Sequence, residues 1–236
     1  MPSIAIIIPC YNEAARLQPV MFQNFISLHP DVQYFFVDDG STDNTAQVLQ
    51  QIKNIAPSSV IIPLRTNVGK GAAVQTGMLQ AMQSNFLLIG YLDADLSTSL
   101  ESFYEIGQTA LHNQLDMALA SRIKKIDTVI ERSFLRHIIG RIIATIIDKH
   151  LQLGVYDTQC GAKVFTPAVL QNVLEKPFYT SWFFDVELIC RIKKQHPQCR
   201  AQEIPLAVWR NVKDSKIGLL SFPKIIKELL VLLSKY

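Results

Sequence analysis

Residues 34–55, YFFVDDGSTDNTAQVLQQIKNI, place an apolar run, a polar turn and an amphipathic stretch in direct succession. The run Tyr34–Val37 is typical of a buried strand, and the pattern over Thr42–Ile55 is typical of a helix. A strand that leads at once into a helix is the repeating unit of α/β folds with parallel sheets.

The same alternation continues on both sides of this unit. The predicted strands of the first half are Ile4–Ile8, Tyr34–Val37, Val60–Leu64 and Phe86–Leu92, and the predicted helices are Glu13–Leu28, Thr42–Ile55 and Gly71–Ser84. This order predicts an α/β fold with a mostly parallel, Rossmann-like sheet and helices on both faces.

The second half is less regular. Its predicted elements are a strand at Met117–Ser121, a helix at Phe134–Leu151, a loop and short strand at Asp157–Phe165, a helix at Asp185–Lys194, a strand at Ala201–Trp209 and a terminal helix at Leu219–Ser234. There is no internal repeat and no linker rich in Pro, Gly or Ser, so we expect residues 1–236 to form a single domain.

Composition excludes several classes. With 236 residues and 49% hydrophobic content the chain has enough apolar material for one core, and a net charge of +3 is too small to indicate nucleic-acid binding. The cysteines form no CxxC pair and the histidines are scattered, which disfavours a zinc site or a disulfide framework. We expect neither a signal peptide nor a transmembrane helix, and therefore a cytoplasmic protein.

Polar clusters follow three predicted strands, at Pro9–Glu13, Asp38–Asp43 and Asp93–Asp95. Ligands of parallel sheets bind beyond the carboxyl ends of the strands, so these clusters are predicted to line one crevice. Asp93 and Asp95 would repel each other in a dry site, and Mg2+ or Mn2+ bridged to substrate phosphates would resolve the repulsion. A solvated acidic loop without a metal is the alternative.

Two motifs between predicted strands and helices, Asp38–Asp43 and Asn67–Gly71, add to this interpretation. Gly40 permits a sharp turn, Ser41 or Thr42 is suited to cap the next helix, and Asp43 suits the positive end of that helix. A plain strand–turn–helix connection would explain these residues, but it would not explain the two acids that close the strand. The segment Asn67–Gly71 combines glycines, Lys70 and a helix start, which favours anion binding. It lacks the glycine and hydroxyl residue that a Walker A loop requires, so an ATPase is disfavoured.

Four motifs together resemble the signature of family 2 inverting glycosyltransferases. They are PCYNE at 9–13, VDDGSTD at 37–43, NVGKG at 67–71 and DAD at 93–95. The second half resembles the dolichyl-phosphate β-glucosyltransferase branch. The resemblance rests on DTQCGAKVF at 157–165, on WFFDVEL at 182–188, and on Trp209 with the later DSK at 214–216. The resemblance implies a GT-A fold, UDP-glucose as donor and a polyprenyl phosphate as acceptor. It also implies a nucleotide-sugar-binding half (1–97) and an acceptor half (98–236) with amphipathic helices.

The resemblance further implies roles for single residues. Asp39 would accept a hydrogen bond from uracil, Asp93 would lie near ribose and metal, and Asp95 would bind the metal directly. Ser97 stands where enzymes that make dolichyl-phosphate mannose often carry Gln as a further metal ligand. The expected substrate-binding residues are Pro9, Tyr11, Asn12, Glu13, Asp38, Asp39, Lys70, Asp93, Ala94, Arg132, Gln159 and Lys163.

A phosphate acceptor needs positive charge more than a base, because its second pKa is about 6 and it is largely dianionic at neutral pH. Arg122, Arg132 and Arg136 are predicted to supply that charge. The expected catalytic residues are Asp95, Asp185, Arg122 and Arg136. The resemblance of the WFFDVEL motif also implies that Asp185 and Glu187 face the site. The alternatives are arginines on a solvated helix face, and Asp185 and Glu187 as acids that stabilise a helix N-terminus.

Two amphipathic segments predict peripheral binding at the cytoplasmic face of a membrane. The first carries the apolar residues Phe134, Ile138, Ile139, Ile142, Ile143, Ile146 and Ile147 beside Arg132, Arg136, His137, Arg141 and Lys149, and the second is Phe222–Leu233 with Lys224 and Lys227. Packing of both apolar faces against the sheet or across a dimer is the alternative. Two other functions stay open: a soluble transferase that glycosylates a saccharide or protein hydroxyl, and a non-catalytic nucleotide-binding protein. The intact Asp39, Asp93 and Asp95 argue against the latter.

Overall fold

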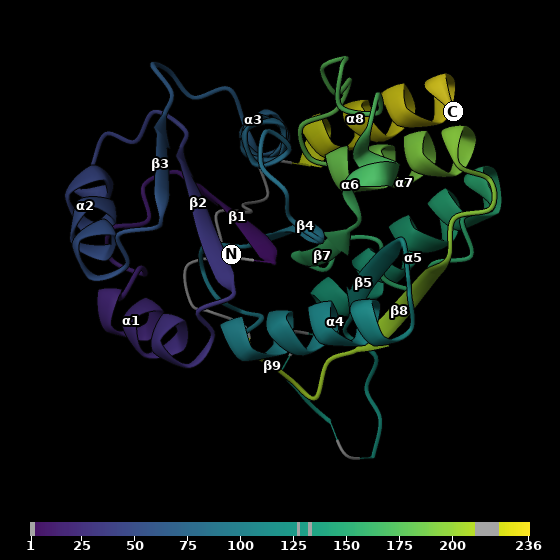
Figure 1. The fold of residues 1–236 in the computed structure, drawn as a ribbon. Coiled ribbons are helices and arrows are strands. Elements are labelled where there is room, and N and C mark those ends of the chain that lie inside the picture. Colours follow the sequence, from purple (N-terminus) through teal and green to yellow (C-terminus); the bar gives the residue numbers. More distant parts are fainter. Residues whose placement is uncertain (1–2, 127, 132–133, 211–221) are drawn as a thin grey trace.

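The computed structural model describes residues 3–126, 128–131, 134–210 and 222–236, and it is organised around one seven-stranded sheet (Figure 1). The strand order is β3-β2-β1-β4-β7-β5-β8, and only β7 runs antiparallel to its neighbours. The strands are β1 (Ile4–Cys10), β2 (Val32–Asp38), β3 (Val60–Pro63), β4 (Leu88–Leu92), β5 (Met117–Ser121), β7 (Ala162–Phe165) and β8 (Ala201–Pro205). The predicted mostly parallel α/β sheet is confirmed.

Helices cover both faces of the sheet, as predicted. Successive side chains of a strand point to opposite faces, so Ile4, Ile6 and Ile8 of β1 face one core while Ala5 and Ile7 face the other. The first core is covered by α1 (Pro19–Leu28), α2 (Thr45–Ile55) and α4 (Leu100–His112). The second is covered by α3 (Lys70–Ala81), α5 (Phe134–Leu151), α6 (Pro167–Leu170), α7 (Phe184–Gln195) and α8 (Phe222–Lys235).

The predicted strand Ala201–Trp209 is divided in the structure. Its first part is β8, which pairs with β5, and its second part is β9 (Val208–Arg210), which pairs with β6 (Val129–Glu131) in a separate two-stranded ladder. The division follows Pro205, which has no N–H to continue a ladder. The next residue, Leu206, donates its N–H to Ser121 O at 2.9 Å.

Other differences concern helices. The helix α4 was not predicted; it begins after Ser99, whose hydroxyl accepts a hydrogen bond from Ser102 N at 3.1 Å. The helix α1 starts at Pro19 rather than Glu13, because the N–H of Glu13 donates to Thr45 Oγ1 at 2.8 Å in another segment. The terminal helix begins at Phe222, and residues 219–221 of the prediction lie outside the described residues.

Candidate active site

The loops after β1 and β2 are bound to each other at the carboxyl edge of the sheet. Asn12, with a φ of 52°, donates its N–H to Ser41 Oγ at 3.0 Å and accepts from Thr42 N at 2.8 Å. Ser41 and Thr42 therefore do not cap the next helix, and that prediction was wrong, because both residues contact the neighbouring loop. Asp43 does stabilise the start of α2, since its carboxylate accepts from Thr45 N at 3.0 Å. Gly40 has a φ of 68°, as a sharp turn requires.

Asp39 holds the Asn67–Gly69 segment in place. Its carboxylate accepts hydrogen bonds from Val68 N at 2.7 Å, Gly69 N at 2.9 Å and Asn67 Nδ2 at 3.0 Å. Burial raises the pKa of this carboxyl, although the two backbone N–H groups oppose the shift. The neighbouring Asp38 is also buried, and it accepts from Ser41 N at 3.0 Å. The two acids at the end of β2 thus fix the turn that follows this strand and the Asn67–Gly69 segment.

Asp93 and Asp95 follow β4, and Asp93 forms an ion pair with Lys70, the first residue of α3. The Lys70 ammonium lies 2.5 Å from Asp93 Oδ1. Burial opposes the charge of this lysine, but the carboxylates of Asp93, Asp185 and Asp95 raise its pKa above the usual value. The backbone of Gly161 packs so closely on Asp93 that a Cβ there would overlap the carboxylate. Ala94, between the two acids, packs into the core.

The donor set at this position fits a hard divalent cation. A positive charge already lies against Asp93, and both acids offer oxygen ligands of the kind that Mg2+ and Mn2+ prefer. Within the described residues no group of three or more His, Cys, Asp and Glu side chains is arranged to hold a metal. An ion here would therefore take its remaining ligands from substrate phosphates and water. Asp95 Oδ1 accepts from Ser97 N at 3.0 Å, so residue 97 orients this acid through its backbone.

A second charged group lies beside Lys70, around Asp185 at the start of α7. The Lys163 side chain is fully buried, and its ammonium contacts Asp185 Oδ2 at 3.3 Å, Tyr91 Oη at 2.9 Å and Cys160 O at 2.8 Å. Burial raises the pKa of Asp185, while Lys163 and Lys70 oppose the shift. Lys163 was expected among the substrate-binding residues, but it supports Asp185 from the interior.

Glu187 was expected to face the site, and this was wrong. Two residues along a helix point in nearly opposite directions, so Glu187 and Asp185 occupy different faces of α7. Glu187 accepts from Tyr179 N at 2.9 Å, Arg191 Nη2 at 2.7 Å and Tyr236 Oη at 3.2 Å. It links the loop before α7 to the C-terminal residue.

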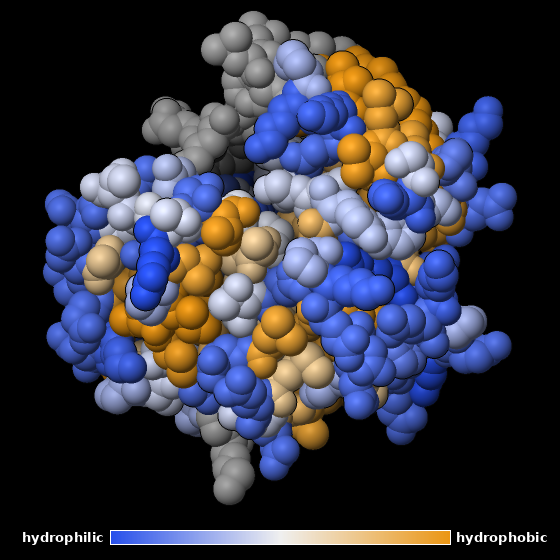
Figure 2. Space-filling view, turned by 90° about the horizontal axis from the view of Figure 1, so that it is seen from above, coloured by the Kyte–Doolittle hydropathy of each residue, from blue (hydrophilic) through white to orange (hydrophobic). Residues whose placement is uncertain are grey.

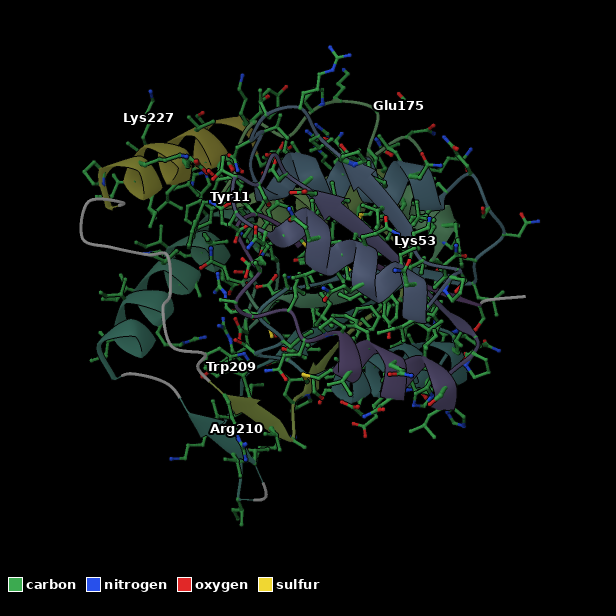
Figure 3. The ribbon with its side chains drawn as sticks, turned by 90° about the vertical axis from the view of Figure 1, so that its left-hand side faces the viewer. Tyr11, Lys53, Glu175, Trp209, Arg210 and Lys227 are labelled. Carbon is green, nitrogen blue, oxygen red and sulfur yellow. The ribbon has the colours of Figure 1, made fainter. Side chains whose placement is uncertain are left out.

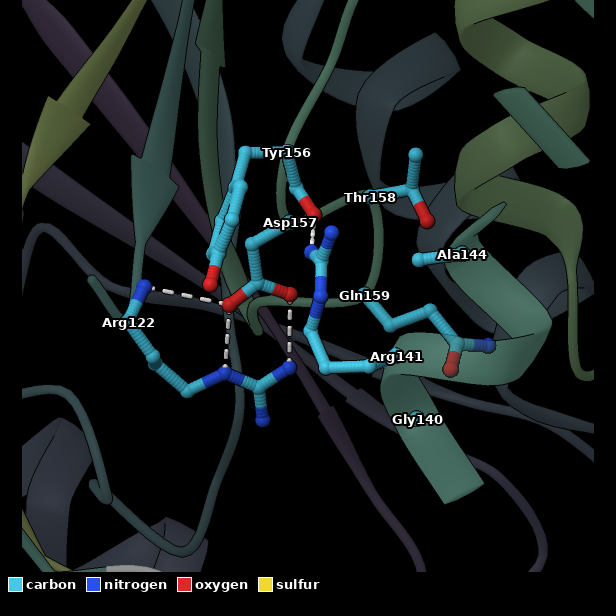
Figure 4. Close-up of a pocket in the computed structure, with 8 residues that line it drawn as sticks. All are labelled: Arg122, Gly140, Arg141, Ala144, Tyr156, Asp157, Thr158 and Gln159. Carbon is cyan, nitrogen blue, oxygen red and sulfur yellow. Dashed lines mark hydrogen bonds and ion pairs between the residues drawn. The ribbon is translucent and has the colours of Figure 1, made fainter. Parts of the chain in front are cut away.

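A pocket lies between α5 and the loop after Tyr156 (Figure 4). Its lining residues are Arg122, Gly140, Arg141, Ala144, Tyr156, Asp157, Thr158 and Gln159. Arg122 forms a bidentate ion pair with Asp157, with both N–O distances at 2.7 Å. Burial opposes ionisation of Asp157, but Arg122 outweighs it and lowers the pKa of Asp157 to about 2.

The pocket keeps polar groups that point to an anionic ligand. Arg141 stacks on the ring of Tyr156, 3.8 Å from its centroid, and donates to Tyr156 O at 2.8 Å. The Thr158 hydroxyl is buried and has no hydrogen-bond partner within the described part of the chain. Two guanidinium groups and a free hydroxyl beside Gln159 are suited to phosphate oxygens.

Of the arginines that the sequence singles out for phosphate, only Arg122 is seen in this pocket. Arg132 lies outside the described residues, and Arg136 lies in α5 with a side chain that is not described. Arg141 was missed as a pocket residue, because its partner Tyr156 is 15 positions away and no local pattern joins the two.

A model of the family described as Glycosyl transferase family 2 matches residues 5–174. The chain belongs to this family and is a glycosyltransferase. It is similar to the dolichyl-phosphate beta-glucosyltransferase of Dictyostelium discoideum, with 30% identity over 235 residues, 91% of this chain and 68% of that protein. The protein of the same name from Saccharomyces cerevisiae is 29% identical over 254 residues, 99% of this chain and 75% of the other.

Solved structures confirm the GT-A fold. The glucosyl-3-phosphoglycerate synthase of Mycobacterium tuberculosis, crystallised with Mn2+, UDP and phosphoglyceric acid, superposes with a TM-score of 0.73. The match covers 98% of this chain and 77% of the other at 14% identity. A structure of the same synthase with Mg2+ and UDP gives a TM-score of 0.71, also at 14% identity, and covers 98% and 78% of the two chains.

Proposed function

We propose that this glycosyltransferase moves glucose from UDP-glucose to a polyprenyl phosphate, with Mg2+ or Mn2+ at Asp93 and Asp95. The observation that carries the proposal is that the acidic pair Asp93 and Asp95 lies close to the arginine pocket. The acidic pair with Lys70 ends β4, and Gly161 joins it to the loop that contributes Asp157 and Gln159 to the arginine pocket. The relatives named above support glucose and a lipid phosphate.

The donor half would hold the nucleotide between the loops after β1 and β2. Asp39, at the base of the Asn67–Gly69 segment, would accept from the uracil N3–H in addition to its three present donors. Tyr11 is 37% exposed at the same edge, and an aromatic ring is the kind of group on which a base can stack. The remaining donor contacts are assigned to Pro9, Asn12, Glu13 and Asp38.

A divalent cation on the diphosphate would stabilise the charge that develops on the leaving UDP. Lys70 and the N–H groups at the start of α3 would add positive potential on the same side. Asp185 lies close enough to Lys70 to affect its pKa, and it would keep that ammonium beside the donor.

The arginine pocket would hold the acceptor phosphate. Arg122, fixed by Asp157, and Arg141, fixed by Tyr156, present guanidinium groups whose positions are already set. An acceptor oxygen would form a bond to C1 of glucose while the bond from C1 to the β-phosphate oxygen breaks, and UDP would leave with that electron pair. A dianionic acceptor has no proton to lose, so this step needs no general base.

A membrane surface fits the outer faces of α5 and α8. None of the helices in the described part of the chain is long and apolar enough to cross a bilayer. The inner faces pack in the core through Ile147, Ile225 and Leu232, yet other apolar residues point outward. They are Ile138, Ile142 and Ile146 on α5 and Ile226 and Leu230 on α8. Figure 2 shows apolar surface over α8, and Figure 3 shows α8 and α5 along one side of the molecule, with Lys227 pointing outward.

Product analysis tests the proposal. The enzyme is incubated with UDP-glucose, Mn2+ and a short-chain polyprenyl phosphate, and the lipid fraction is analysed by mass spectrometry. We expect a glucosyl phospholipid, and no product from the matching polyprenol, which lacks the phosphate. Glucose transfer to a saccharide or peptide hydroxyl but not to the phosphate would replace this proposal, and Asp185 would then be the candidate base.

A further inference from the structure

The Lys70 ammonium occupies the position at Asp93 where a divalent cation would bind. The pair faces the open end of the sheet, since the side chains of Lys70 and Asp93 are 42% and 32% exposed. The ammonium also lies 6.0 Å from the ring centroid of Tyr91 and 5.8 Å from that of Phe184. These aromatic faces are attractive to a cation but bind it only weakly.

Asp93 cannot easily turn away from this position. Its N–H donates to Gly161 O at 2.9 Å, and its carboxylate lies against the Gly161 backbone. Lys70 is in a different situation, because its ammonium ends a flexible stem of four carbons at the first turn of a helix. If the two partners must separate, Lys70 is the one that moves.

We propose that Lys70 is a placeholder for the metal: it neutralises Asp93 in the metal-free enzyme, and a divalent cation displaces it toward the donor diphosphate. This inference rests on the proposed function, which supplies the metal and the nucleotide. An ammonium and a divalent cation cannot both contact one carboxylate oxygen, because their like charges repel strongly at that distance. The displaced ammonium remains near the start of α3, where an anionic ligand is favoured.

The two roles of Lys70 have opposite consequences. Without nucleotide, Lys70 competes with the metal and weakens its binding. With nucleotide, Lys70 contacts the diphosphate and strengthens binding of the metal–nucleotide complex. Metal and nucleotide are thereby coupled through one side chain, and the coupling is reciprocal.

Lys70→Met tests this directly, because methionine keeps most of the stem and its contacts with Tyr91 and Phe184 but removes the charge. Mn2+ binding without nucleotide is measured from the free-ion signal in electron paramagnetic resonance, and UDP binding in saturating Mn2+ by calorimetry. We expect Lys70→Met to bind Mn2+ alone at least about 5-fold more tightly than wild type, and UDP with Mn2+ at least about 5-fold more weakly. Lys70→Arg, which keeps the charge, should lie near wild type in both measurements.

Lys53→Met, on the last turn of α2, is the matched control for a lost lysine charge and should change neither constant. If Lys70→Met binds Mn2+ alone as weakly as wild type or more weakly, the placeholder role is wrong, even if UDP binding still depends on Mn2+. If wild type binds UDP equally well with Mn2+ and with EDTA, the proposed metal site fails, and the placeholder fails with it.

Discussion

The proposed donor half, residues 1–97, and the proposed acceptor half, residues 98–236, are held together by different kinds of interaction. Around the loops after β1 and β2, side chains bind backbone N–H groups of neighbouring loops, as Asp39 does with Val68 and Gly69. In the acceptor half, buried charges bind each other, as in Arg122 with Asp157 and Lys163 with Asp185. The first arrangement shapes loops around a ligand, whereas the second places charges where water cannot screen them. Substitutions at Asp39 should therefore act mainly on ligand binding, whereas substitutions in the buried ion pairs should also act on folding.

The largest expected effect on activity lies in the donor half. Asp95→Ala should reduce turnover by at least about 1,000-fold, because the diphosphate loses electrostatic stabilisation as it leaves. The free energy of unfolding should change by less than about 0.5 kcal/mol, since Asp95 is partly exposed. Turnover, UDP calorimetry with and without EDTA, and urea unfolding measure these effects, with the loop variant Glu175→Ala as control. UDP binding that ignores both EDTA and the substitution would show that the metal site is misassigned.

The acceptor half should respond through stability. Arg122→Met leaves Asp157 buried without its partner, and breaking such a pair costs about 3 kcal/mol or more. Urea unfolding measures the loss. The double variant Arg122→Met, Asp157→Asn should recover part of it, because no unpaired charge remains. Arg200→Met removes an arginine from the surface and should have little effect. A cost below about 1 kcal/mol for Arg122→Met would mean that the two halves do not differ in this way.

Acid provides a milder test of the same pair. The pKa of Asp157 is lowered to about 2 in the folded protein, below the usual value of 3.8. Its contribution to stability is therefore complete above about pH 4 and is lost as the pH falls toward 2, with a magnitude of about 2 kcal/mol. Asp157→Asn should lack this component in unfolding curves measured from pH 5 to pH 2. The contribution of Asp39 to stability has the opposite sign, because burial raises the pKa of this carboxyl. Its charge opposes folding at neutral pH, and this cost disappears as the pH falls. If wild type and Asp157→Asn lose stability in parallel, Asp157 is not the group responsible.

The same difference explains what the sequence could predict. The motifs of the donor half lie directly after strands, so the rule that ligands bind at the carboxyl ends of parallel strands predicted one site for Asn12, Asp39 and Asp93. Asn12 does contact the loop after β2. In the acceptor half, a motif identifies Asp157 but not its partner. Arg122 lies 35 residues earlier, and only the pairing of β5, β7 and β8 brings the two together. The division after Pro205 likewise depends on which strands are available as partners.

Asp39→Asn tests the proposed recognition of the nucleotide by Asp39. Asparagine keeps one acceptor oxygen but turns the other into a donor that faces N–H groups, so the Asn67–Gly69 segment should loosen. We expect UDP affinity to fall about 10-fold, as loss of a charge-assisted hydrogen bond would cause. Thermal shift with UDP and CDP separates the two roles. Uracil has an N3–H to donate and cytosine has none, so base recognition predicts that wild type is protected more by UDP and that the variant loses this preference. Equal protection of wild type by UDP and CDP would contradict base recognition. The role of Asp39 would then be only to hold the Asn67–Gly69 segment.

The smallest expected effect concerns the outer faces of α5 and α8. Truncation before Leu219 is a poor test of membrane binding, because it would remove α8, whose Ile225 and Leu232 belong to the core and whose Glu228 accepts from Trp182 N at 2.6 Å. Surface substitutions avoid this loss. Ile142 and Leu230 are 55% and 63% exposed, so each would transfer only part of its apolar surface to a bilayer, worth about 1 kcal/mol.

Ile142→Glu and Leu230→Glu should therefore each weaken co-sedimentation with anionic liposomes by about 5-fold at low salt. Lys227→Gln should weaken it by a similar factor, because a basic residue near such a surface contributes about 1 kcal/mol. Leu28→Glu, at the end of α1 and 75% exposed, is the matched control and should bind as wild type does. Turnover with a water-soluble acceptor phosphate should be unchanged in all of them, since none lines the crevice or the arginine pocket. If wild type does not sediment with the liposomes, or if all four variants sediment alike, these faces serve another contact, and a soluble phosphate becomes the better acceptor.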